Sequence, residues 1–78
     1  MVPVDQLDAG QRAVVRSVAG GRGMARRLEA MGIRPGKVLQ KVNSQFMGGP
    51  VTVMVDDRYI AIGRGLAARI FVDPNEAI

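Results

Sequence analysis

Few side chains in this sequence are suited to catalysis. The 78 residues include no histidine and no cysteine, the residue types that most often serve as general bases, nucleophiles and ligands for zinc or iron. General acid–base chemistry near neutral pH would depend on carboxylates, arginines and two lysines. The acidic residues are scattered along the chain: Asp5, Asp8, Glu29, Asp56, Asp57, Asp73 and Glu76. The sequence therefore predicts a protein that is not an enzyme.

The adjacent pair Asp56-Asp57 is a poor catalytic pair. Neighbouring residues of a strand point to opposite faces, and the pair reads more simply as a tight turn between two strands. The methionines do not indicate a copper site either, because Met24 and Met31 fit the apolar stripe of a helix. No cofactor is expected and no residue is assigned to a metal, although a weak carboxylate-bound divalent cation is left open.

Two glycine-rich segments, residues 20–23 and 63–65, could be mistaken for phosphate-binding loops. Backbone N–H groups at a helix start do attract anions. However, neither segment has the glycine spacing or the Lys-Ser/Thr ending of a Walker loop. We interpret both segments as turns.

The chain carries a formal net charge of +4, which suits an acidic partner, a nucleic acid or an anionic surface. Solubility alone also explains such a charge. Arg22, Arg26, Arg27 and Arg34 could cluster around a helix, but the chain has only one tyrosine, two phenylalanines and no tryptophan to stack on bases. A small basic nucleic-acid-binding barrel is thus an alternative, and no nucleic acid is expected as the partner.

Glycine and proline interrupt the chain at short intervals, and valine- and isoleucine-rich runs lie between them. These runs predict strands at residues 12–18, 38–43, 51–55, 58–62 and 69–72. A break in the alternation predicts a bulge near Arg16 or Ser17. In residues 38–43, Val38 and Val42 alternate with Gln40 and flank Lys41.

One segment predicts a helix instead. In residues 24–31, Met24, Leu28 and Met31 form one apolar stripe. Gly32 stands where a left-handed residue would end the helix, and Ile33 is then placed to contact Leu28. Pro35-Gly36 supplies the following turn.

Five short strands and one helix cannot bury both faces of a flat sheet. We therefore expect a mostly β fold, a small five-stranded SH3-like barrel with one short α-helix inserted after the first strand. An OB-like barrel is the alternative. The helix should close an open end of the barrel. We expect one domain over residues 1–78, with its core in residues 7–73 and a loose tail at residues 74–78.

The amino terminus shows no signal peptide, and no apolar run reaches the roughly 20 residues of a membrane helix. The chain begins with Met1 and its pattern starts almost at once, as expected of a complete chain. We expect a cytoplasmic location without direct insertion into a membrane.

Taken together, several segments resemble the ferrous iron transport protein A (FeoA) family. The similarity covers residues 7–73 and is carried by residues 7–10, 13–15, 27–36, 49–53 and 60–72. Its most specific part is Arg-Leu-Glu-x-Met-Gly-Ile-x-Pro-Gly at residues 27–36. The resemblance implies an SH3-like barrel and a non-enzymatic accessory of FeoB, the membrane ferrous iron transporter with a cytoplasmic GTPase domain. It leaves open an iron-sensing regulatory domain like those of iron-dependent repressors.

A docking module should present apolar side chains on a loop. Phe46 and Met47, within a turn-rich stretch, are the candidates for partner binding, with Arg22, Arg26 and Arg27 as an electrostatic rim. Phe46 could equally fold back and cap the barrel. The sequence leaves the oligomeric state open.

Overall fold

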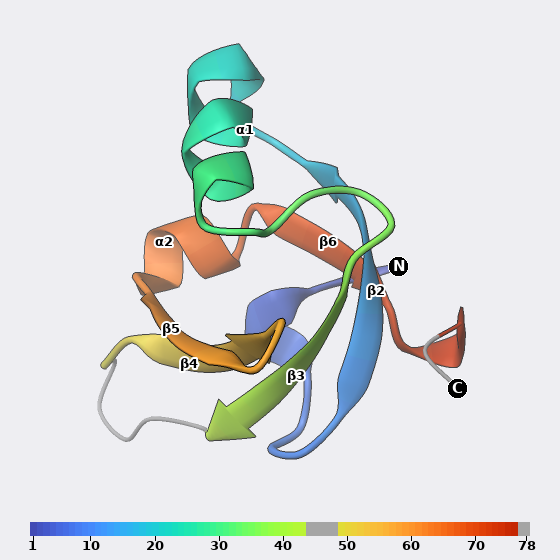
Figure 1. Cartoon of the computed structure of the whole chain (residues 1–78). Helices are drawn as coiled ribbons and strands as arrows, with labels where there is room; N and C mark the ends of the chain where they lie inside the picture. The colour runs from blue at the N-terminus through green and yellow to red at the C-terminus, as the bar shows by residue number, and fades with distance from the viewer. Residues whose placement is uncertain (44–48, 77–78) are drawn as a thin grey trace.

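The computed structural model describes residues 1–43 and 49–76 of the chain, which form an antiparallel sheet with short helices (Figure 1). The sheet has six strands in this part of the chain, in the order β1-β6-β2-β3-β4-β5. Their bounds are β1 Val2–Pro3, β2 Arg12–Val18, β3 Val38–Asn43, β4 Val51–Val55, β5 Arg58–Ile62 and β6 Ile70–Asp73. The mostly β fold is confirmed, and four of the five predicted strands have the predicted bounds.

The prediction of five strands was wrong by one. β1 pairs with β6 through Val2 opposite Val72 and Pro3 opposite Phe71. A strand of two residues is too short to show an alternating pattern, and Pro3 is tolerated because β1 lies at the edge of the sheet. β6 itself begins and ends one residue later than expected.

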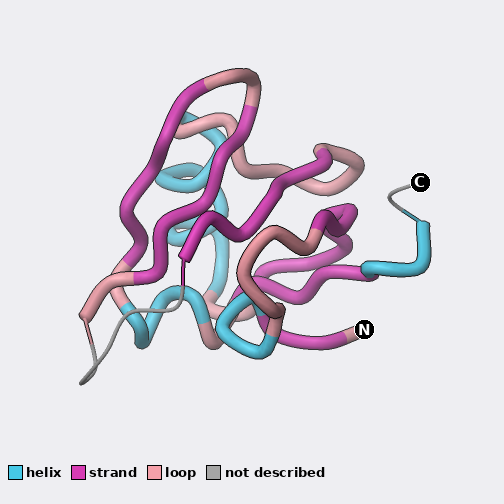
Figure 2. The backbone as a smooth tube through the Cα atoms, turned by 90° about the horizontal axis from the view of Figure 1, so that it is seen from below, coloured by secondary structure: helices cyan, strands magenta, loops and turns pink. Residues whose placement is uncertain are grey.

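The sheet is strongly bent, so its strands run around a core instead of lying flat (Figure 2). One cause is the predicted bulge, which the structure confirms as a register shift between Val15 and Ser17 where β2 pairs with β6. β1 and β5 are the two edges, and no pairing joins them among the described residues. The sheet is thus a curled, SH3-like sheet that stays open along one side.

Helix α1, Gly21–Ala30, follows β2 as predicted but begins earlier than residue 24. Its end is confirmed in detail. Gly32 has φ +89°, its N–H donates to the Glu29 carbonyl at 2.9 Å, and the Ile33 N–H donates to the Leu28 carbonyl at 2.8 Å. This is the Schellman arrangement expected from the glycine.

Three short elements of the described residues were not predicted: the 3₁₀ turns η1, Val4–Gln6, and η3, Pro74–Glu76, and the helix α2, Arg64–Ala67. α2 occupies one of the glycine-rich segments that we interpreted as a turn. η3 replaces the first part of the expected loose tail, and residues 77–78 lie outside the described part of the chain. Elements of three or four residues carry no periodic pattern, so the sequence could not reveal them.

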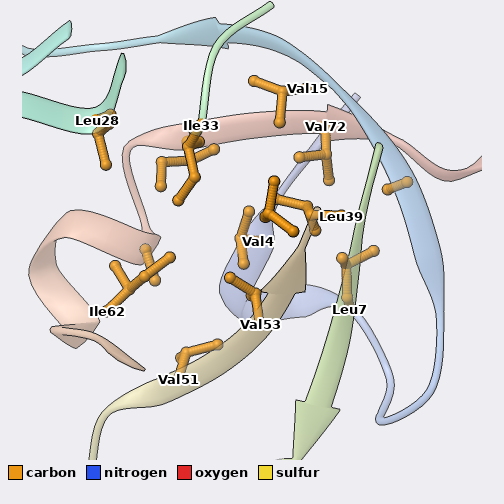
Figure 3. Packing of buried hydrophobic residues seen from close by; sticks show 14 residues of the cluster. Val4, Leu7, Val15, Leu28, Ile33, Leu39, Val51, Val53, Ile62 and Val72 are labelled. Atoms are coloured by element: carbon orange, nitrogen blue, oxygen red, sulfur yellow. The ribbon is translucent and has the colours of Figure 1, made fainter. Parts of the chain in front are cut away.

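The core gathers side chains from both ends of the chain (Figure 3). As expected, α1 lies at one end of the curled sheet, and its Leu28 is fully buried. Ile33 is 1% exposed beside it. The cluster also includes Val4, which is fully buried before the predicted core boundary at Leu7.

Candidate partner-binding surface

The proposed apolar pair, Phe46 and Met47, lies outside the described residues. The three arginines of the proposed rim, Arg22, Arg26 and Arg27, all belong to α1 and are all exposed. The structure therefore locates the charged part of the predicted surface on one helix.

The three arginines do not share one side of α1. With Leu28 directed into the core, the helical repeat places Arg22 on the same flank as Ala25, and Arg26, one turn after Arg22, between that flank and the solvent-facing side. Arg27 precedes Leu28 by one residue and so lies on the opposite flank. The structure brings together two of the three predicted arginines and separates the third.

The flank that carries Arg22 and Ala25 borders a groove between α1 and β2. The groove has a volume of about 280 Å³ and an apolar lining contributed by Val18, Ala25, Ile33 and Pro35. Arg16, Arg34 and Glu29 also line it.

Sequence reasoning associated Arg34 with the helix but missed the β2 side of this groove. Arg16 and Ser17 line it at the bulge. The broken alternation near these residues was the available signal, because a bulge re-aims the side chains of its strand.

A hydrogen bond joins the end of α1 to the β4–β5 hairpin, and an ion pair joins the residue before β3 to the same hairpin. Arg58 Nη2 donates to the Met31 carbonyl at 3.3 Å, at the carboxyl end of the helix. Lys37 Nζ pairs with Asp56 at 2.9 Å. The hydrogen bond from Lys37 lowers the pKa of Asp56 below its ordinary value of 3.8, and the charges of Lys37, Arg58 and Arg34 add to the effect.

The hairpin turn that receives this ion pair is the predicted Asp56-Asp57 connection. Both residues have positive φ, 51° and 62°, as a two-residue turn of this type requires. The two carboxylates are exposed and serve the turn. Their geometry fits the interpretation of Asp56-Asp57 as a tight turn between two strands.

A second groove, of about 360 Å³, lies on the outer face of the sheet. The register there aligns Arg12, Gln40, Met54 and Tyr59 in one row across β2 to β5. Tyr59 is 71% exposed at the end of the row. This surface has mixed charge, since Asp56 and Asp57 line the groove as well as Arg12.

Within residues 1–43 and 49–76, no three acidic side chains come together as they would around a metal ion. No helix of this part of the chain has both the length and the apolar character needed to cross a bilayer.

The comparisons with known proteins agree with the resemblance seen in the sequence. The model of the FeoA domain family matches residues 2–74. A relative from Methanocaldococcus jannaschii, named Fe(2+) transport protein A, is 37% identical over 76 residues, which cover 97% of this chain and 90% of the relative. The chain belongs to the FeoA family.

Solved structures extend this finding. The crystal structure of an iron uptake regulatory protein (FeoA) superposes with a TM-score of 0.82 at 34% identity, covering 91% of this chain and 92% of that one. A manganese-dependent transcriptional repressor gives a TM-score of 0.82 at 19% identity, covering 92% of this chain and 40% of the repressor. The likeness to the repressor shows a shared fold alone.

Membership of the FeoA family gives the coarse function. FeoA proteins are small accessory proteins associated with ferrous iron transport, and they are not enzymes. The poor catalytic inventory of the sequence is consistent with this role.

Proposed function

We propose that this FeoA-family protein is a cytoplasmic accessory that docks on the cytoplasmic part of the ferrous iron transporter FeoB and modulates iron uptake. Family membership supports the link to ferrous iron transport. The observation that carries the docking step is the flank of α1 with Arg22 and Arg26, both exposed on a helix that Leu28 anchors in the core.

Such a surface suits a partner with negative charge. The chain has a net charge of +4, and an oppositely charged surface would speed encounter and orient the two proteins. Because exposed charges are screened by salt, docking should weaken as ionic strength rises.

The test is a pull-down of the full chain with detergent-solubilised FeoB and with its isolated GTPase domain, with and without nucleotide. The double variant R22E/R26E should bind at least about tenfold more weakly, since two favourable contacts become repulsive. The control R27E/R64E makes the same change in net charge at exposed positions away from this flank and should bind nearly as well as the wild type. Equal binding by both variants, or none by the wild type, would contradict the proposal.

The same assay tests the loop residues that lie outside the described part of the chain. Phe46 and Met47 remain predicted apolar contacts. Changing Phe46 to serine should weaken binding without lowering the melting temperature, whereas a variant that melts several degrees lower would place Phe46 in the core.

A further inference from the structure

The groove between α1 and β2 combines an apolar lining with positive charge around it. Val18, Ile33 and Pro35 give it an apolar lining, and Ala25 leaves space on the helix side because its side chain is short. Its volume of about 280 Å³ lies just below the range typical of small-molecule sites. The hollow is therefore of a size for one anchoring side chain and not for a large ligand.

The charges around this groove are strongly unequal. Arg16 and Arg34 line it, and Arg22 and Arg26 extend the positive charge along the adjacent side of α1. Glu29 is the single acidic side chain among the described residues that line the groove. A segment that fills the hollow would thus place its neighbouring residues among arginines, where acidic side chains are favoured.

We propose that this groove binds an extended or helical peptide segment that inserts one large aliphatic side chain and carries acidic residues on both sides of it. The proposal rests on the docking function above, for which it names the chemistry of the partner segment. A membrane surface fits less well, because the apolar atoms lie in a hollow between arginines instead of projecting outward. A nucleic acid fits less well because no aromatic side chain among the described residues lines the groove.

Binding can be measured without the transporter, by fluorescence anisotropy of a labelled synthetic peptide with one central leucine flanked by glutamates. Two control peptides replace the leucine by serine, or the glutamates by lysines. The full chain should bind the first peptide at least about tenfold more tightly than either control, because serine buries no large apolar side chain and the lysines would face arginines.

Two matched pairs of variants locate the site. Ala25→Leu fills the groove, whereas Ala30→Leu adds the same side chain at an exposed position of α1 that does not line the groove. Arg26→Glu and Arg27→Glu reverse the charge of adjacent residues, of which Arg26 lies nearer the groove. A25L and R26E should each reduce affinity about tenfold, while A30L and R27E should change it less than about threefold.

Amide chemical shifts of the wild-type chain provide a measurement that does not depend on any variant folding. Titration with the leucine peptide should shift the signals of Ser17, Val18, Ala25 and Ile33 more than those of Arg27 and Ala30. Shifts concentrated at the outer sheet row near Tyr59 would overturn the proposal.

Other outcomes separate this inference from the docking function. If the serine peptide binds as tightly as the leucine peptide, or if phosphatidylglycerol vesicles or a single-stranded oligonucleotide bind more tightly than either, the groove is not a peptide site. If A25L still binds FeoB like the wild type while R22E/R26E does not, docking stands and the groove inference fails. If the peptide binds the groove but FeoB does not bind the chain, only the identity of the partner is wrong.

Discussion

At the scale of single residues, Lys41 is the side chain whose role was least predictable from the sequence. It is 4% exposed, and its ammonium group donates to the Leu7 carbonyl at 2.6 Å and to the Asp5 carbonyl at 3.1 Å. In β3, Val38, Gln40 and Val42 occupy one face, and Leu39 and Lys41 occupy the other. Because each face carries both apolar and polar residues, the alternation did not show that the face with Leu39 and Lys41 points into the core. In the structure Val42 is the exposed residue, at 39%.

A buried lysine is stable only where acceptors replace its water, and here the acceptors come from a segment far away in the sequence. The hydrogen bonds tie residues 5–7 to β3. Alternation reports on one strand at a time, so it could not foresee a partner more than thirty residues away.

Changing Lys41 to methionine should lower the free energy of unfolding by about 1–3 kcal/mol. The substitution keeps the length of the side chain but leaves the Leu7 and Asp5 carbonyls without their donor. Lys37→Met is the matched control, because Lys37 forms an exposed ion pair and should cost less than about 1 kcal/mol. Urea denaturation of the two variants measures both values, and equal stabilities would mean that the buried hydrogen bonds contribute nothing net.

At the scale of elements, the most informative part of the molecule is the joint between α1 and the β4–β5 hairpin. Residues 28–37 end the helix, turn the chain and lead it into β3. Within this joint, Arg58 reaches the Met31 carbonyl and a side chain at Gly32 would meet the Arg58 guanidinium. The positive φ of Gly32 thus favours glycine, and a side chain there would also push the Arg58 guanidinium aside by a small distance.

Gly32→Ala should therefore cost more than Gly36→Ala. Both glycines have positive φ, +89° and +94°, so alanine is strained at each by about 1–2 kcal/mol. At Gly36 an added Cβ meets nothing within 4 Å, whereas at Gly32 it would lie 3.0 Å from Arg58 Nη2. The hydrogen bond to Met31 should then be lost as well, adding about 1 kcal/mol. Thermal and urea unfolding of both variants should show this order. Equal losses of unfolding free energy would mean that the Arg58 guanidinium moves away from the added Cβ without any cost in stability.

The same joint shows why some elements could be predicted. The helix stripe, Gly32 and Pro35-Gly36 act within a few residues of one another, and their conformations follow from local sterics. The groove beside α1 does not follow from local sterics, because its walls come from β2, α1 and the segment after α1. The arginines of α1 were identifiable from sequence, but only the orientation of Leu28 decided which of them flank the groove.

At the scale of the whole molecule, the sheet is open along one side, and short elements near the ends of the chain contribute to the core there. β1 and β5 are unpaired with each other in the described residues, and η1 contacts both α2 and β6. Val4 of η1 is fully buried in the cluster shown in Figure 3. Short elements from the amino-terminal segment thus cover core that a closed barrel would enclose with strands.

This arrangement predicts that the amino-terminal segment is part of the folding unit. Val4→Ala should lower the free energy of unfolding by about 2 kcal/mol, since it removes buried methyl groups and leaves a cavity. Val42→Ala makes the same change at an exposed strand position and should cost less than about 0.5 kcal/mol.

The magnitude matters because a domain of this size buries a small core and has little stability to spare. A loss of about 2 kcal/mol at Val4 would be a large fraction of its total stability. Hydrogen exchange adds a second measurement: amides of β6 that face β1 should exchange faster in V4A than in V42A, because η1 holds β1 against that strand. If V4A and V42A unfold at the same urea concentration, the first six residues pack on the core without stabilising it, and the curled sheet is sufficient alone.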